Sequence, residues 1–354
     1  MHVSVSGSAP NWIPSANFDI SDCSVINIDC TNIDTIAETM YGIVIIGANN
    51  FRVERNYIKF SVTNRGTNEA IALASAGQST AALSHHGIIN ANHCDGSGVQ
   101  ADGHNMKVTN NVIHDFKFGG GITFNLTDDP NDPLLFDTIH DNEIIGNTIY
   151  KSTGIDVNDT WPNGIENWGK RTIISGNVCY DNSGSGIATA GLQCIVTNNI
   201  CYNNGAGVAA PHVNHDRAGI ELLYRDDTFN VSESVIVGNR CFDTRTGSSR
   251  TQLYGIQDDS DTGSAPYSSN VTIGVNSLLG NATAPSNIHG SNYAILNPIT
   301  GGGVVLSAPP AAPADGELNN SNVSFFLDEG ADELKIRVKY SDGVTFKTGT
   351  IMLT

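Results

Sequence analysis

The sequence predicts an all-β protein in which a parallel solenoid is followed by a small β module, and three observations lead to this expectation. Only 15% of the 354 residues are charged, so Asn, Ser, Thr and Gly must supply most of the surface polarity, and these residues are poor helix formers. One short motif recurs eight times, and a Gly-Ile or Gly-Val pair falls between many of its copies. A unit repeated at a spacing of about 20 residues is typical of stacked coils.

The repeated motif has the form aliphatic-x-x-Asn-x-aliphatic, with Cys allowed in the last position. Its asparagines are Asn56, Asn92, Asn111, Asn147, Asn177, Asn199, Asn239 and Asn276. The shortest intervals, 19 residues from Asn92 to Asn111 and 22 from Asn177 to Asn199, set the length of one coil, and longer intervals contain loop insertions. We expect roughly ten coils, because one coil cannot bury its apolar side alone and must stack on others.

The role that we predict for the repeated Asn is structural. Asn tolerates the left-handed backbone conformation of a tight corner, and stacked side-chain amides can bond to one another along a column. Cys94, Cys179, Cys201 and Cys241 occupy the motif position that other copies fill with Ile or Leu. They should be small buried side chains with free thiols, since the seven cysteines include no Cys-x-x-Cys pair and no Cys/His metal-binding spacing.

The organisation along the chain follows from where the repeat begins and ends. Residues 1–17 form a lead-in, 18–297 the solenoid, 298–316 a Pro- and Gly-rich linker, and 317–354 a small β module. Residues 335–340 alternate between basic and apolar or aromatic side chains, which predicts a half-buried strand, and a Ser-Asp-Gly hairpin turn follows. Three short strands are marginal alone, so this module should dock on the end of the solenoid or pair with copies in an oligomer.

Composition also restricts the partners. With 36 acidic and 18 basic residues the net charge is -18, which argues against nucleic acid, whose phosphates need a basic surface. No apolar run is long enough for a transmembrane helix, and the first residues lack the basic and apolar regions of a signal peptide. We therefore expect neither a nucleic acid nor a membrane as a partner.

Residues 18–295 resemble the right-handed parallel β-helix of the pectate-lyase-like superfamily. The Gly-Ile-x strand matches the first sheet of that family, and the Asn motif matches the run from its second sheet through a tight corner into its third. The C-terminal run from Phe325 to Thr354 resembles a short tail found in phage tail and virion-associated proteins. These resemblances imply a polysaccharide depolymerase of the phage tailspike type, forming a homotrimer on a virion tail and acting outside the cell.

Chemistry is expected on the outward-facing column of the first sheet. On a Gly-Ile-x strand the Ile points inward, so the residue x points outward. Along the stack, x is Val44, Gln100, Thr123, Glu166, Ala188, Ala209 or Glu221, and Gln257, and Asp156 competes for the coil of Glu166. Acids therefore occur only at the centre of the column, as Asp156, Glu166 and Glu221, which suggests a catalytic site.

Aromatic and basic residues accompany these acids in the sequence. The candidate substrate-binding residues are Trp161, Trp168, His212, His215, Arg217 and Tyr224. The faces of Trp and Tyr side chains are platforms on which sugar rings stack, although the same side chains equally suit core packing. The substrate expected from this set is an extracellular glycan, with uronic acids among its sugars.

Two mechanisms fit these residues. In β-elimination, Glu166 and Glu221 would bind Ca²⁺, which bridges to the uronic acid carboxylate. Lys170 or Arg225 would then be the base that removes the neighbouring proton. In hydrolysis, Asp156 or Glu166 would pair with Glu221 across the glycosidic bond, one of the two being protonated. We place elimination slightly ahead of hydrolysis.

The order of Glu166 and Lys170 faintly resembles that of β-helix alginate and chondroitin lyases, whose following coil carries an Arg. Here that strand reads Gly-Ile-Ala-Thr-Ala from Gly186 and has no Arg.

Two further functions stay open: a non-catalytic glycan-binding or structural spike, and a uronan C5-epimerase, which shares the proton-abstraction step. The histidines of two pairs near strand ends, His85-His86 and His114-Asp115, are expected to be hydrogen-bonded structural residues.

Overall fold

The structure of the protein is a computed structural model, and the chain divides into two units, residues 1–294 and 295–354. It describes residues 2–3, 15–28, 39–60, 67–74, 83–117, 119–124, 139–153, 162–207, 217–224, 230–260, 268–289, 294–295, 297–298, 304–305, 323–328, 333–339 and 346–352. Within these residues the chain forms strands and one 3-10 turn at Gly247–Ser249, with no α-helix. No helix among them is long and apolar enough to cross a membrane.

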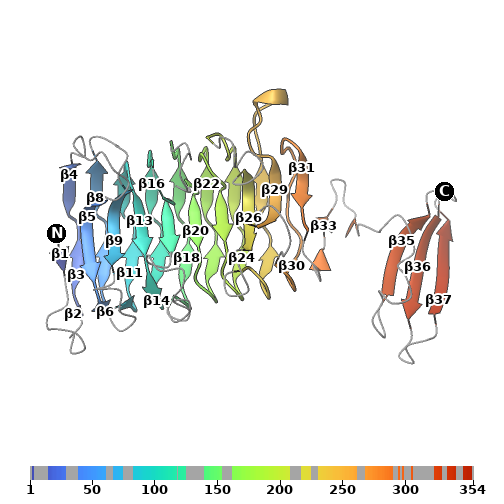
Figure 1. Cartoon of the computed structure of the whole chain (residues 1–354), viewed down its shortest axis with the longest axis horizontal. Coiled ribbons are helices and arrows are strands. Elements are labelled where there is room, and N and C mark those ends of the chain that lie inside the picture. Colours follow the sequence, from blue (N-terminus) through green and yellow to red (C-terminus); the bar gives the residue numbers. More distant parts are fainter. Residues whose placement is uncertain are drawn as a thin grey trace. The chain divides into compact units, whose positions relative to one another are not determined.

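Three long parallel sheets run along the first unit, and most coils add one strand to each (Figure 1). The first sheet contains β1 (His2–Val3), β5 (Thr39–Ile46), β9 (Thr67–Ala74), β13 (Gly98–Ala101), β17 (Ile122–Phe124), β20 (Ile165–Asn167), β23 (Ile187–Thr189), β26 (Ala218–Tyr224), β29 (Tyr254–Ser260) and β31 (Ala284–Asn287). The second contains β3 (Asp19–Ser21), β7 (Arg52–Glu54), β11 (Ile88–Asn90), β15 (Lys107–Thr109), β18 (Glu143–Ile145), β21 (Ile173–Ser175), β24 (Ile195–Thr197), β27 (Val235–Val237), β30 (Thr272–Ile273) and β32 (Ala294–Ile295). The third contains β4 (Ser24–Ile28), β8 (Tyr57–Phe60), β12 (His93–Asp95), β16 (Val112–His114), β19 (Thr148–Tyr150), β22 (Val178–Tyr180), β25 (Ile200–Tyr202) and β28 (Arg240–Phe242).

A short fourth sheet lies at one corner of the coils. It contains β2 (Ser15–Ala16), β6 (Ala48–Asn49), β10 (Ser84–His85) and β14 (Gly103–His104). The ten strands of the first sheet confirm the prediction of a β-helix of roughly ten coils.

The coils stack in register, so that like residues share a column. In the third sheet Cys179 pairs with Cys201 and Cys201 with Cys241, and all three side chains are fully buried. The described cysteines are free thiols, as the sequence predicts. In the first sheet the isoleucines of the Gly-Ile pairs form an equivalent buried column, for example Ile165, Ile187 and Ile220.

The repeated asparagines form a continuous hydrogen-bonded ladder inside one corner. The Nδ2 of Asn147 donates to the Oδ1 of Asn177 at 2.9 Å and to the carbonyl oxygen of Val108 at 2.9 Å. Its own Oδ1 accepts from the backbone N–H and the Nδ2 of Asn111. The same pattern links all eight asparagines of the motif, which are buried, and confirms their structural role.

One detail of that prediction is wrong, because the repeated Asn does not adopt the left-handed conformation. The residue before it does so in seven of the eight copies, as Arg55, Ala91, Asn110, Gly146, Gly176, Asn198 and Gly238. The preceding residue makes the turn, and this leaves the Asn side chain pointing into the coil, where it can join the ladder. At this corner, Asn110 and Asn198 therefore use the left-handed tolerance of asparagine.

Aromatic side chains form a second ladder on the outer face of the third sheet. Neighbouring ring centroids of Tyr150, Tyr180 and Tyr202 lie 4.8 and 4.9 Å apart, and Phe242 follows at 5.3 Å. The rings are nearly parallel, so their faces contact one another. This ladder stabilises the stack in the way that stacked aromatic residues do in other parallel in-register sheets.

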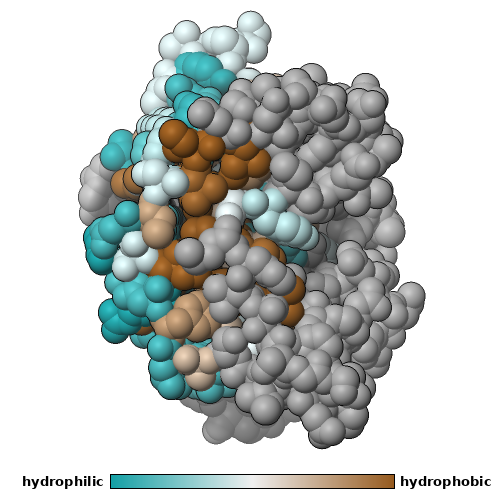
Figure 2. Space-filling model, turned by 90° about the vertical axis from the view of Figure 1, so that its left-hand side faces the viewer, coloured by the Kyte–Doolittle hydropathy of each residue, from teal (hydrophilic) through white to brown (hydrophobic). Residues whose placement is uncertain are grey.

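The N-terminal end of the first unit shows a cross-section of the coils. In Figure 2 hydrophobic residues gather near the centre of this end, and hydrophilic residues lie along the rim on the left. Ile26 in β4 and Tyr41 in β5 are exposed by 53% and 42%. A terminal coil has a neighbouring coil on one side only, which explains why large apolar side chains reach the surface there.

The second unit contains two small antiparallel sheets. β33 (Asn297–Pro298) pairs with β34 (Val304–Val305), and β36 (Glu333–Lys339) pairs with both β35 (Val323–Asp328) and β37 (Phe346–Met352). The three-stranded sheet confirms the small C-terminal β module that the alternating sequence predicts. The predicted hairpin turn at residues 341–343 lies outside the described residues.

Candidate functional site

The predicted outward column of the first sheet is present, and it aligns two acids. Thr123 pairs with Glu166, Glu166 with Ala188, Ala188 with Glu221, and Glu221 with Gln257. Glu166 and Glu221 are thus two coils apart, which places their backbones about 9–10 Å from each other at the usual spacing of strands. A single small residue, Ala188, stands between them.

Both carboxyl groups are shielded from water, although their column faces outward. Glu166 is exposed by 5% and Glu221 by 0%. Beside them, Trp168 packs against Ala188, Ala190 and Leu223, with Leu192 half-buried at the margin. Because alanine side chains are small, they leave room for the indole on the outer face of the sheet.

A different hydrogen-bond donor holds each carboxylate. The indole Nε1–H of Trp168 donates to Oε1 of Glu166 at 2.7 Å. The hydroxyl of Ser185 donates to Oε2 of Glu221 at 2.8 Å and accepts the backbone N–H of Ala218 at 3.0 Å. The two acids therefore have distinct environments, and distinct environments are what separates an acid from a base in a two-carboxylate site.

A buried amide lies next to Ser185. The Oδ1 of Asn163 accepts the backbone N–H of Ser185 at 2.8 Å, whereas its Nδ2 has no hydrogen-bond partner within the described part of the chain. Asn163 is fully buried, and a buried unpaired donor costs about 1–3 kcal/mol. Gly184 is needed beside it, because a Cβ there would lie 2.6 Å from the Asn163 Oδ1.

Other predicted site residues lie outside this column. The backbone of Lys170 forms a parallel β-bridge with that of His140. The imidazole of His140 stacks on that of His104 in a column at the corner of the coils. Burial lowers the pKa of Lys170, and Arg171 adds to the effect. A lowered pKa is what a lysine base requires, so the electrostatics suit the predicted role although the column is a different one.

Arg217 and Tyr224 lie at opposite ends of β26, the strand that contains Glu221. The Nε of Arg217 donates to the carbonyl oxygen of Thr251 at 3.1 Å, and burial lowers the pKa of its guanidinium. Tyr224, at the end of the strand, is exposed by 9%. Trp168 is exposed by 6%, so a sugar could stack on its indole only after a neighbouring group moved.

Five of the predicted site residues lie outside the described residues, and these are Asp156, Trp161, His212, His215 and Arg225. Their roles stay predictions. The register shows that Glu166 and Glu221 occupy the outward column of the first sheet, because Glu166 pairs with Thr123, and Glu221 with Ala188.

The predicted calcium site also stays a prediction. Ca²⁺ takes six to eight oxygen ligands in proteins, whereas Glu166 and Glu221 stand two coils apart, with one oxygen of each bonded to Trp168 and Ser185. Among the described residues, Asp95, His114 and Asp115 are the acidic and imidazole side chains close enough to share an ion.

Sequence reasoning missed Ser185 and Asn163. Both precede a Gly-Ile pair by one residue, at the point where the chain enters the first sheet. A polar residue at that position in two successive coils was the available signal, but its contact with Glu221 depends on how the carboxylate turns back along the strand.

No protein-family model matches the sequence, and no curated protein matches it. Among solved structures, the chain is similar to the A-module of a mannuronan C-5 epimerase from Azotobacter vinelandii, with 14% identity over 80% of this chain and 74% of that one and a TM-score of 0.48. It is also similar to an alginate lyase from a Paenibacillus species, with 15% identity over 77% and 95% and a TM-score of 0.37. The enzymatically active domain of tailspike protein 2 from bacteriophage CBA120 is similar at 11% identity over 96% and 65%, with a TM-score of 0.43.

Proposed function

We propose that this protein depolymerises an extracellular glycan whose chain lies along the outer face of the first sheet. The observation that carries the proposal is the pair of buried carboxyl groups, Glu166 and Glu221, aligned in one column two coils apart. Burying two ionisable groups is costly, and strongly desolvated acids gather at functional sites more often than elsewhere.

The geometry favours hydrolysis of the glycosidic bond. One carboxyl group would protonate the leaving glycosidic oxygen, while the other would take a proton from the attacking water. Inverting glycosidases hold their two carboxyl groups about 6.5–9.5 Å apart so that the water fits between them. The backbones of Glu166 and Glu221 stand about 9–10 Å apart. The indole of Trp168 packs over Ala188 between them and would have to move for a sugar and a water molecule to enter.

β-Elimination is the second candidate, and one observation favours it. Burial lowers the pKa of Lys170, which prepares a lysine to accept a proton. In this alternative Glu166 and Glu221 would bind the uronic acid part of the substrate, directly or through a cation. Epimerisation would use the same proton abstraction without shortening the chain.

The test is the substitution of each acid by its amide. Glu166→Gln and Glu221→Gln should each lower the rate of chain cleavage by about 10²–10⁴-fold, the range for loss of a general acid or base. Glu143→Gln, at a half-exposed position that pairs with Lys107 on the second sheet, is the matched control and should retain activity. Capsular, cell-wall and algal glycans are offered, and thermal unfolding establishes that each variant folds.

Two readings separate the chemistries. New reducing ends without ultraviolet absorbance indicate hydrolysis, and ends with the absorbance of an unsaturated uronate indicate elimination. Cleavage that persists unchanged in both acid variants contradicts the proposed site. Binding without cleavage of any glycan supports a non-catalytic spike instead.

The trimeric state and the place on a virion tail belong to the same proposal and rest on the resemblance of the C-terminal run. Sedimentation equilibrium of the intact chain should give three times its mass of 37.5 kDa. A monomer at micromolar concentration would contradict the trimer without affecting the proposed site.

A further inference from the structure

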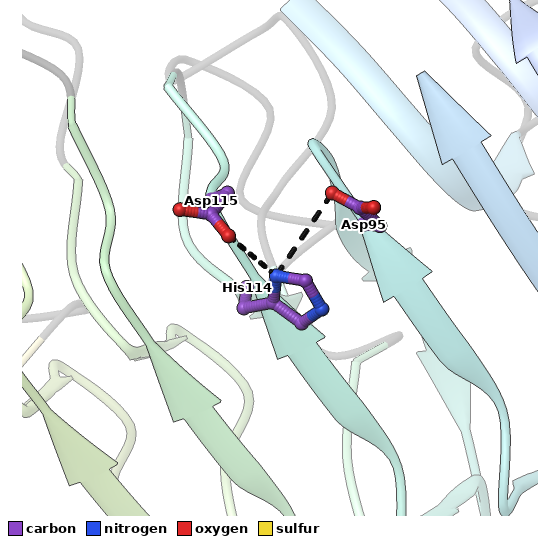
Figure 3. A group of neighbouring side chains, drawn as sticks. All are labelled: Asp95, His114 and Asp115. Atoms are coloured by element: carbon purple, nitrogen blue, oxygen red, sulfur yellow. Dashed lines mark hydrogen bonds and ion pairs between the residues drawn. The ribbon is translucent and has the colours of Figure 1, made fainter. Parts of the chain in front are cut away.

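A compact group of ionisable side chains lies on the outer face of the third sheet, apart from the carboxylate column of the first sheet. It joins two neighbouring coils, because Asp95 in β12 pairs in register with His114 in β16. Asp115 follows His114 in the left-handed conformation, and His93 stands two residues before Asp95 on the same face. Figure 3 shows the His114 ring between the carboxylates of Asp95 and Asp115.

The carboxylates determine which nitrogen of His114 carries a proton. Its Nδ1 lies 2.6 Å from Oδ2 of Asp115 and 3.9 Å from Oδ1 of Asp95. A ring nitrogen that faces a carboxylate at hydrogen-bond distance is the protonated one, so the Nε2 of neutral His114 presents its lone pair. Ligand histidines at metal sites are commonly oriented by a carboxylate in this way.

A second imidazole approaches that lone pair. The Nε2 of His93 lies 2.7 Å from the Nε2 of His114. His93 is exposed, whereas the side chain of His114 is exposed by only 13%. The two Nε2 atoms, from adjacent coils, thus form a hydrogen bond at the surface in which His93 donates, and the His93 ring also contacts the edge of Tyr57.

We propose that His93 and His114 bind a divalent transition-metal ion through their Nε2 atoms, with Asp115 orienting His114 from behind. Imidazole nitrogen is a preferred ligand of Zn²⁺, Ni²⁺ and Cu²⁺, whereas Ca²⁺ and Mg²⁺ prefer oxygen. Zinc–nitrogen bonds of about 2.0–2.1 Å in a tetrahedral site require the nitrogens to stand about 3.3 Å apart. The ion would replace the hydrogen bond between the two nitrogens, which requires His93 to move outward, and water would complete the coordination. The ion would join two coils and stabilise the stack.

The opposite side of the His114 ring is less suited to an ion. An ion there would need the Nδ1 of His114 and the carboxylates of Asp95 and Asp115. The Oδ2 of Asp95 already accepts a hydrogen bond from Nζ of Lys59 at 2.5 Å. A cation at this side would therefore lie close to the lysine ammonium and would break the contact of Asp115 with Nδ1.

The experiment is a calorimetric titration of the intact, chelator-treated protein with ZnCl₂. The wild type should bind one equivalent of Zn²⁺ more than His93→Gln, and Asp115→Asn should bind that equivalent about 10–100-fold more weakly, as expected for loss of an orienting carboxylate. Asp95→Asn and His289→Gln, a change of an exposed histidine elsewhere, should bind like the wild type. The wild type and His93→Gln share every other histidine, so the difference between them isolates this site.

A second readout is the melting temperature with and without ZnCl₂. Zinc should raise it more for the wild type than for His93→Gln, because a ligand that binds only the folded state stabilises it. Equal stoichiometry for the wild type and His93→Gln overturns the proposal. So does loss of the equivalent in Asp95→Asn together with its retention in His93→Gln, which would place the ion on the Nδ1 side.

Discussion

At the scale of single residues, a stack of histidines at one corner of the coils makes the stability of the fold depend on pH. The imidazole of His104 stacks between those of His85 and His140, at 4.9 and 5.0 Å. Burial lowers the pKa of His104 to about 4, and the neighbouring His85, His140 and His86 add to this, against a smaller opposing effect of Asp141. The folded state therefore keeps this ring neutral.

The consequence is a loss of stability in acid. The unfolded chain binds a proton at His104 near pH 6.5 and the folded chain only near pH 4, so this contribution is complete above about pH 6.5 and is lost as the pH falls toward 4. Because the ring is partly exposed, the contribution is on the order of 1 kcal/mol after allowance for solvent screening. His104→Gln should flatten the fall in melting temperature between pH 6.5 and 4.

The control for that measurement is His289→Gln, which changes an exposed histidine. Its melting temperature should follow the wild-type curve over the same pH range. An unaltered curve for His104→Gln would show that the stacked imidazoles do not govern acid stability.

At the scale of elements, the glycines before each first-sheet strand decide how closely coils approach. A Cβ at Gly186 would lie 2.7 Å from the carbonyl oxygen of Gly219 and 2.9 Å from the Cβ of Cys201. Neither atom is the end of a flexible side chain. Gly186→Ala should therefore force β23 away from β26, with a loss of about 1–3 kcal/mol or more in the free energy of unfolding.

Gly119→Ala is the matched comparison. Gly119 has a φ of +70° with no atom within 4 Å of a Cβ, so this change tests backbone strain without overpacking. It should cost about 1–2 kcal/mol. Chemical denaturation followed by circular dichroism measures both variants, and equal losses would show that close packing at Gly186 is not limiting.

The sequence predicts these elements well because stacking imposes one register on every coil. The repeated Asn and the Gly-Ile pairs locate the columns, and through them the alignment of Glu166 with Glu221. The bond from Trp168 to Glu166 and the approach of His93 to His114 could not be predicted, because both join residues of different columns. Contacts between columns depend on side-chain rotamers, which column spacing does not determine.

At the scale of the whole molecule, the Asn ladder ties eight coils of the first unit together. Asn147→Ala would remove the acceptor of two donors on Asn111 and the donor to Val108. Leaving these buried groups unpaired should lower the free energy of unfolding by about 2–4 kcal/mol. Guanidinium denaturation provides the measurement.

The matched control is Asn90→Ala, which removes an amide from the outer face of the second sheet. Asn90 accepts hydrogen bonds from Thr109 and Asn110, and both are near solvent that can replace it. The cost should stay below about 1 kcal/mol. Similar losses for Asn90→Ala and Asn147→Ala would mean that the ladder adds nothing beyond an ordinary surface amide.

The burial of the cysteine side chains inside the coils determines how they can be oxidised. Burial raises the pKa of the Cys94 thiol to about 12, and it also raises the pKa values of Cys179 and Cys241. Oxidants attack the thiolate form, and these groups are both protonated and out of reach. Because the side chains of Cys94, Cys179 and Cys241 are fully buried, their oxidation can begin only when neighbouring coils separate.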